Sequence, residues 1–256
     1  MLQTSGAILL CHSDDFRRGV LANVRLAGVD CRGGVVVAHA ADAIVDAPEI
    51  EGRCSSVVVR RHLDRYWLCL PLDDNRRQLV LDTFCGMIAE DYERLIEVER
   101  NQDNIVVLLR ALRNQFGVTI GETVVDWGCG TGLSLPLARE VGLNVIGVDR
   151  SPEMRRIAAA RGMTVYSIDE LSGWTDGSVP AAFASYVFHL LCEFEGLGIL
   201  WRKLHQGGVL VGNFHKDGEL DSVVEFLSEA GAAVLSLDVP HAPLRHGRYL
   251  GFAKVG

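Results

Sequence analysis

The sequence lacks any apolar run long enough to cross a membrane, and it has no recognisable export signal. Near the N-terminus, the apolar segment 7–11 is cut short by His12, Asp14 and Asp15. A signal peptide needs a basic start and a longer apolar region, and a membrane-spanning helix needs about 20 apolar residues. We therefore expect a cytoplasmic protein with no membrane partner.

The chain also lacks an excess of positive charge. Its 256 residues carry a formal net charge of −8, which disfavours a partner that is recognised through its phosphates. Arginines occur as isolated pairs, at 60–61, 76–77 and 155–156, rather than as a basic stripe. We predict no nucleic-acid partner.

Cysteine and histidine spacing gives no sign of a metal site. The seven cysteines have no Cys-x-x-Cys spacing, and no His/Cys cluster matches a zinc site. Scattered cysteines in odd number indicate free thiols in a reducing compartment. We predict no bound metal.

The chain is instead organised around a glycine-rich turn. A β-branched run ends at Asp126, and glycines then occupy alternate positions from 128 to 132. This pattern predicts a buried strand, a tight turn and a helix start. Glycines there let the backbone approach a ligand closely. A second acid, Asp149, ends the next strand-like run, where a nucleotide ribose is commonly held.

Strand-like and helical segments alternate after residue 117, which predicts a parallel sheet with helices on both faces. The expected strands are 123–126, 144–148, 164–168, 181–187, 207–213, about 233–238 and 248–253. We expect three parts: a small N-terminal α/β module over 1–72, a helical lid and linker over 73–117, and a ligand-binding core over 118–256.

The N-terminal module belongs to no family that we recognise. Its strand candidates are 6–11, 35–38, 56–59 and 66–70. Between the first two, the spacing of the apolar residues from Phe16 to Leu26 predicts a helix capped by Ser13 or Asp14.

Three motifs resemble those of the class I S-adenosylmethionine-dependent methyltransferases. Asp-Trp-Gly-Cys-Gly-Thr-Gly at 126–132 resembles motif I, and Asp-Arg-Ser-Pro-Glu-Met at 149–154 resembles the acid and helix start that follow the second strand. The segment 204–211 resembles the Gly-Gly turn into strand five. The resemblance implies a seven-stranded, mostly parallel, doubly wound sheet with an antiparallel last strand, and S-adenosylmethionine as cofactor. A nicotinamide dehydrogenase is disfavoured because the third glycine comes one residue early.

The resemblance also implies cofactor contacts. Asp149 would accept both ribose hydroxyls, the alternative being a cap for the following helix. Asp169 would receive the adenine amino group, with Glu170 as the alternative. Tyr92 lies in a segment like the family's lid and would touch the methionine end, or would simply pack a helix. The predicted cofactor-binding residues are Tyr92, Asp126, Gly128, Cys129, Gly130, Asp149, Arg150, Ile168, Asp169 and Ser185.

Catalysis of methyl transfer needs in-line positioning, and a base where the acceptor is a hydroxyl. His189, after the fourth core strand, is the best candidate base and His215 the second; His189 could equally be a histidine packed under the lid. Cys129 has no base beside it in sequence and is not expected to act as a nucleophile.

The expected function is methyl transfer to a small-molecule acceptor at oxygen, nitrogen or carbon. The chain lacks an Asn/Asp-Pro-Pro-Tyr/Phe segment and a Pro-Cys pair after strand four. Methylation of adenine, glutamine amides or cytosine C5 is therefore disfavoured. The alternative is a protein that binds the cofactor without transferring methyl groups and acts through a partner, or as a homodimer, by way of its N-terminal module.

Overall fold

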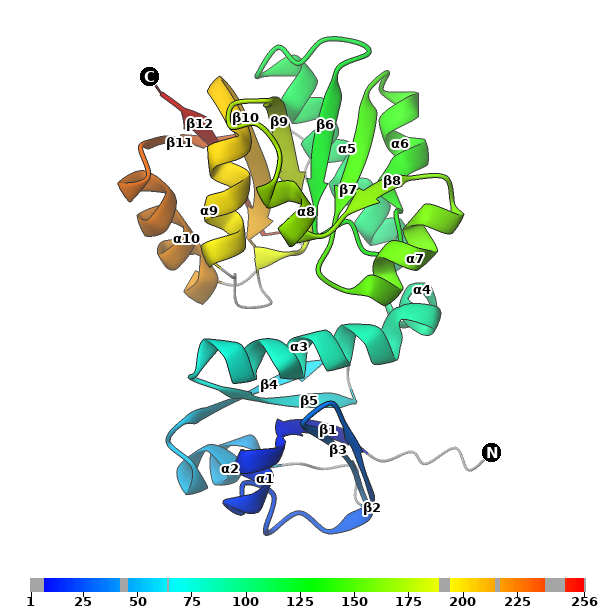
Figure 1. Ribbon diagram of the computed structural model, residues 1–256, viewed down its shortest axis with the longest axis vertical. Coiled ribbons are helices and arrows are strands. Elements are labelled where there is room, and N and C mark those ends of the chain that lie inside the picture. The colour runs from blue at the N-terminus through cyan, green and yellow to red at the C-terminus, as the bar shows by residue number, and fades with distance from the viewer. Residues whose placement is uncertain are drawn as a thin grey trace. The chain divides into compact units, whose positions relative to one another are not determined.

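A computed structural model describes residues 7–41, 46–63, 65–188, 194–214, 217–237 and 247–255, with only the backbone at 217–219. The chain divides into two compact units, Met1–Ile88 and Ala89–Gly256, each with its own sheet (Figure 1). The boundary between the units falls inside the segment 73–117 that the sequence suggested as a lid and linker.

The first unit is built on a five-stranded sheet with strand order β2-β3-β1-β5-β4. Its strands pair antiparallel except for β1 and β5, which run parallel. The strands are β1 (Ile8–His12), β2 (Leu26–Arg32), β3 (Val35–Ala40), β4 (Val57–His62) and β5 (Tyr66–Pro71), and the helices are α1 (Ser13–Arg17), α2 (Ala47–Arg53) and α3 (Asp74–Ile88). The helix predicted through Leu26 is wrong: α1 ends at Arg17, and β2 begins at Leu26.

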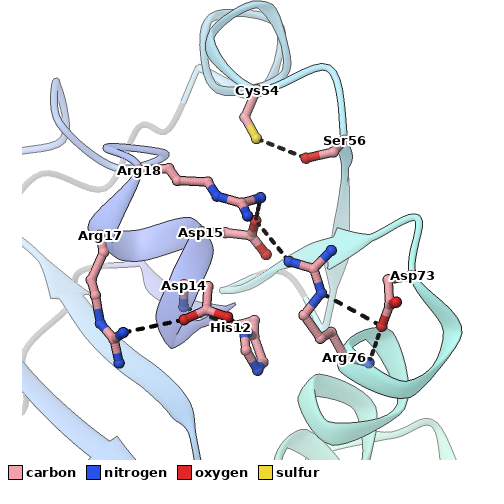
Figure 2. A network of polar contacts seen from close by, with 9 residues as sticks. All are labelled: His12, Asp14, Asp15, Arg17, Arg18, Cys54, Ser56, Asp73 and Arg76. Carbon is pink, nitrogen blue, oxygen red and sulfur yellow. Dashed lines mark hydrogen bonds and ion pairs between the residues drawn. The ribbon is translucent and has the colours of Figure 1, made fainter.

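A buried carboxylate links α1 to the start of α3 within this unit. Asp15 is 0% exposed, and guanidinium nitrogens of Arg18 and Arg76 lie 3.6 and 3.7 Å from its Oδ1. Figure 2 shows the two arginines reaching Asp15 from different elements. Asp73 accepts a hydrogen bond from the Arg76 N–H at 2.9 Å and so caps the first turn of α3. One arginine therefore contacts both the cap of α3 and the acid of α1.

The second unit contains a seven-stranded sheet with strand order β11-β12-β10-β9-β6-β7-β8. Only β12 runs antiparallel to its neighbours. The strands are β6 (Thr123–Trp127), β7 (Asn144–Val148), β8 (Thr164–Tyr166), β9 (Val179–Ala184), β10 (Leu204–Phe214), β11 (Ala232–Ser236) and β12 (Arg248–Lys254). This confirms the predicted doubly wound fold with an antiparallel last strand.

Helices cover both faces of this sheet, as Figure 1 shows for α5 and α9. They are α4 (Tyr92–Leu95, after the 3-10 turn Ala89–Asp91), α5 (Val98–Asn114), α6 (Ser134–Glu140), α7 (Pro152–Ala160), α8 (Ile168–Ser172), α9 (Phe194–Lys203) and α10 (Asp217–Glu229). Because strand side chains alternate, Val124 joins the hydrophobic cluster under α5, whereas Val125 joins the cluster under α9. No described helix is both long and apolar enough to cross a membrane.

The strand order reverses between β6 and β9. From β6, the chain builds the sheet outward through β7 and β8, and then returns to add β9 and β10 on the other side. In open parallel sheets, ligands bind at the carboxyl ends of the strands at such a switch point. The loops after β6 and β9 are therefore where a binding site is expected.

Candidate active site

The glycine-rich turn after β6 needs glycine for two separate reasons. Gly128, Gly130 and Gly132 have φ values of 76°, 52° and 83°, a left-handed region that a Cβ disfavours. At Gly128, a Cβ would lie 2.4 Å from a methyl carbon of Val187 in the loop after β9. The N–H of Gly128 also donates to the Val148 carbonyl at 2.8 Å. The turn is thus tied to β7 and closed against the opposite loop.

Asp149 holds this turn to the start of the next helix. Its Oδ2 accepts from the Gly130 N–H at 2.8 Å, and its Oδ1 accepts from the Ser151 N–H at 2.9 Å. The helix cap itself is Ser151, whose hydroxyl accepts from the Met154 N–H. A carboxylate can accept several hydrogen bonds at once, which is the property that the predicted ribose contact requires. Arg150 follows it, half-buried.

Asp126, at the end of β6, is a buried acid without a charged partner of opposite sign in the described ion pairs. It is 4% exposed, and its Oδ2 accepts a hydrogen bond from the Ser134 hydroxyl. Burial raises its pKa to about 7, and the neighbouring Asp149 carboxylate adds to the rise. Asp126 therefore titrates near neutrality, in the manner of many functional-site acids.

Cys129 packs inside the turn, against β7. Its thiol is buried, and its Sγ would lie 2.5 Å from a Cβ placed on Gly147 of β7. Burial and two nearby carboxylates hold the pKa of the thiol well above its usual range. A thiol in this state is a poor nucleophile, which supports a packing role.

The short helix α4 lies directly over the glycine turn. A Cβ on Gly130 would be 3.7 Å from a ring carbon of Tyr92. Next to it, Glu93 accepts a hydrogen bond from the Thr131 hydroxyl at 2.7 Å and pairs with Arg161 of the segment after α7. Tyr92 thus lies beside the glycine turn, and its contact with the cofactor stays a prediction.

Asp169 and Glu170, the two candidate acids for the adenine contact, follow β8 and have different surroundings. Glu170 accepts from the Ser167 N–H at 2.7 Å while the Ser167 hydroxyl accepts from the Glu170 N–H, forming a capping box. This box occupies Glu170. Asp169 is exposed in the first turn of α8, and Ile168 is half-buried beside it.

A buried polar network that the sequence did not reveal lies after β9. The Asn104 amide of α5 donates to the Ser185 hydroxyl at 2.7 Å and to Asn213 Oδ1 at 3.0 Å, and Tyr249 donates to Asn104 Oδ1 at 2.6 Å. One feature of the sequence points to this network. Asn104 is spaced four and eight residues from Leu108 and Leu112, so it is a polar residue on the apolar face of α5.

Both predicted bases, His189 and His215, lie outside the described residues. Ser185 lies in the loop after β9, two residues before the Val187 that packs beside Gly128. Most of the predicted cofactor-binding residues lie around the switch point: the turn residues, Asp149, Tyr92 and Ser185. Ile168 and Asp169 lie after the end of β8.

Comparisons with known proteins agree with this geometry. Residues 125–212 match the family model of the methyltransferase domain. A demethylmenaquinone methyltransferase of Tropheryma whipplei is 46% identical over 52 residues, 20% of this chain and 22% of that protein. The chain thus matches about a fifth of the length of this curated relative.

Among solved structures, a candidate S-adenosyl-L-methionine-dependent methyltransferase of Methanococcus maripaludis aligns with a TM-score of 0.50 and 15% identity, over 68% of this chain and 92% of that one. A magnesium protoporphyrin IX methyltransferase of Synechocystis aligns with a TM-score of 0.42 and 22% identity, over 60% and 77% of the two chains. The sheet order and switch-point turn define a class I methyltransferase fold. Within this fold, the segment that matches the methyltransferase domain contains the glycine turn and Asp149.

Proposed function

We propose that the protein transfers a methyl group from S-adenosylmethionine to a small-molecule acceptor at oxygen, nitrogen or carbon. The observation that carries this proposal is the glycine turn at the switch point, locked to β7 and to Asp149, inside the segment that matches the methyltransferase domain. The turn offers backbone at close range, and Asp149 offers carboxylate oxygens to a ribose.

The other predicted residues surround this centre. Tyr92 would cover the methionine end, Ser185 would line the wall after β9, and Asp169 with Ile168 would hold the adenine. Cys129 and Arg150 would contribute as part of the turn and of the acidic loop. In this assignment the chain binds its cofactor across the carboxyl ends of β6, β7, β8 and β9.

The chain's part in catalysis is to hold the two reactants in line. The bound cofactor supplies an electrophilic methyl group on a sulfonium. Excluding water and aligning the acceptor then provide most of the required assistance. For a hydroxyl acceptor, His189 is our proposed base and His215 the second choice, because imidazole titrates near neutrality.

Two measurements on the full chain test this function. Calorimetric titration with S-adenosylmethionine, S-adenosylhomocysteine and NADH identifies the cofactor, and release of S-adenosylhomocysteine in the presence of phenols, amines or carboxylates reports turnover. We expect both adenosyl ligands to bind and at least one acceptor class to react. Tight binding of NADH alone would overturn the proposal, and cofactor binding without any turnover would favour a binding protein that acts through a partner.

Asp149 provides the sharpest single variant. Asp149→Ala removes both carboxylate oxygens from the predicted ribose contact and from the turn, so we expect S-adenosylhomocysteine affinity to fall by about 100-fold, equivalent to about 2.7 kcal/mol. Asp176→Ala is the matched control, because Asp176 pairs with Lys203 elsewhere in the unit. Equal affinities in the two variants would contradict the assignment of Asp149.

A further inference from the structure

Tyr186, two residues after β9, has a backbone conformation that must be held in place. Its φ is 56°, which is uncommon for a residue with a side chain because the Cβ crowds the backbone. Its N–H donates a hydrogen bond to Asn213 Oδ1 at 2.8 Å. Asn213 belongs to β10 and is 1% exposed. A buried amide on the neighbouring strand therefore supports the unfavourable conformation.

Asn213 is in turn fixed by a second buried amide. Asn104 of α5 is 0% exposed and donates to the same Oδ1 of Asn213 at 3.0 Å. Tyr249 of β12 donates to the Asn104 oxygen at 2.6 Å. Because the Asn104 amide is engaged on both its nitrogen and its oxygen, its orientation is defined. Three separate elements thus determine where the Asn213 oxygen points.

The side chain of Tyr186 is held from the same helix. Arg100 Nε donates to the Tyr186 hydroxyl at 3.0 Å, and the guanidinium carbon lies 5.5 Å from the ring centroid. Arg100 and Asn104 are four residues apart and so share one face of α5. This face therefore fixes the phenol directly and the backbone N–H through Asn213.

Tyr186 lies in the loop after β9 that meets the glycine turn. It follows β9 at the switch point, and its neighbour Val187 packs against Gly128 of the glycine turn. We propose that Tyr186 forms a wall of the acceptor pocket, and that Arg100, Asn104 and Asn213 are positioning residues that hold it there. This inference rests on the proposed methyl transfer, and it assigns to Arg100 and Asn213 control of the acceptor rather than of the cofactor.

The backbone part of the proposal can be tested without knowing the acceptor. Asn213→Leu keeps the branched shape but removes the oxygen, whereas Asn213→Asp keeps an oxygen that can accept from Tyr186. Amide hydrogen exchange followed by NMR on the full chain should show the Tyr186 amide exchanging about tenfold faster in N213L, with much of the protection restored in N213D. Asn144→Leu is the control, since Asn144 donates to the Gly121 carbonyl far along the chain from β9.

A second variant, Tyr186→Gly, tests the same claim if N213L is poorly stable. Glycine adopts positive φ without a Cβ penalty, so N213L should lower the melting temperature less in a Tyr186→Gly background than in the wild type. The comparison between backgrounds removes the cost of losing the Tyr186 side chain. Unchanged Tyr186 exchange in N213L, or an equal loss of melting temperature in the two backgrounds, would overturn the view that Asn213 holds a left-handed residue.

The functional part of the proposal is tested by comparing kcat/KM for the acceptor with the Kd for S-adenosylhomocysteine. With the acceptor that reacts best in the turnover screen, we expect N213L and Arg100→Met to lower kcat/KM about tenfold, while the Kd for S-adenosylhomocysteine changes less than twofold. Arg110→Met, an exposed arginine on the same helix, should match the wild type in both. Equal losses in kcat/KM and cofactor affinity, or no loss in either, would overturn the positioning role. Absence of S-adenosylhomocysteine binding in the wild type would instead refute the proposed function.

Discussion

Asp15 and Asp126 are both buried carboxylates, one in each unit, but their surroundings are opposite in character. Asp15 is 0% exposed and lies between two arginine guanidinium groups, as Figure 2 shows. Asp126 is 4% exposed, accepts a hydrogen bond from the Ser134 hydroxyl and lies near the second acid, Asp149. Burial removes solvation from both acids, and only the first is compensated by positive charge in the described ion pairs.

The difference indicates different uses of a buried acid. A carboxylate paired with two arginines joins parts of a structure, here α1 and α3, and is costly to break. A carboxylate that is buried beside another acid keeps a pKa of about 7 and changes charge in the working range of most enzymes. Such perturbed acids gather at functional sites, which agrees with the position of Asp126 below the glycine turn.

The largest expected effect comes from neutralising Asp126. Because its folded pKa is raised from 3.8 to about 7, its contribution to stability is fully present below pH 3.8 and is lost as the pH rises to 7. Asp126→Asn removes this loss, so its free energy of unfolding should exceed that of the wild type by at most about 4 kcal/mol above pH 7, and by little near pH 4. Urea unfolding without ligand across that pH range measures the difference; a constant difference would contradict the assigned pKa.

The second prediction concerns Arg76, which pairs with the buried Asp15 in the first unit. Arg76→Met leaves Asp15 buried with only the more exposed Arg18 nearby, so we expect the first unit to lose roughly 2–3 kcal/mol, somewhat less than for a fully buried pair. Trp67 lies in this unit, and its fluorescence during urea unfolding follows the change. Full stability in Arg76→Met would show that Asp15 does not depend on this guanidinium.

The third prediction concerns Ser134, whose hydroxyl donates a hydrogen bond to Asp126. Ser134→Ala removes the hydroxyl that stabilises the ionised carboxylate, so the loss in stability should be about 1 kcal/mol at pH 8 and smaller at pH 5. Ser172→Ala, which removes an exposed hydroxyl bonded to the Asp169 carbonyl, is the matched control. An equal loss at both pH values would point to packing rather than to charge.

The smallest effect is expected on the surface of α1. Arg17 pairs with Asp14 at 3.3 Å, but both side chains are well exposed. Solvent screens such a pair, so Arg17→Met should change stability by less than about 0.5 kcal/mol. Its urea midpoint, beside that of Arg76→Met, separates the effect of a buried acid from that of arginine loss in general.

The core of the second unit could be predicted because its signals are local and agree with one another. Strand ends, alternate glycines and helix caps lie in short runs, and the antiparallel β12 follows from the family pattern. Two strand boundaries differ from the prediction for physical reasons. The strand predicted over 181–187 ends at Ala184, because Tyr186 turns into the left-handed region. The strand predicted over 164–168 ends at Tyr166, where Ser167 and Glu170 form a capping box that the sequence displays.

Long-range polar contacts were not predictable in the same way. Asn104 and Asn213 are 109 positions apart and meet only after α5 packs beside β10. In the first unit, the apolar spacing from Phe16 to Leu26 fits a helix, but Leu26 pairs with Ala40 of β3 instead. Tertiary pairing overrides local periodicity where an edge strand can extend a sheet.

The contact between Gly128 and Val187 has a consequence for redesigning the proposed activity. The glycine turn is proposed to face the nucleoside, and the loop after β9 is proposed to shape the acceptor pocket. The two meet where a methyl group of Val187 fills the space beside Gly128. A bulkier side chain at 187 would press on the glycine turn, whereas Val187→Ala would open space without displacing it. Changes of acceptor preference should therefore be easier to engineer by reduction at this position than by enlargement, and each gain there should be checked against the hold on the nucleoside.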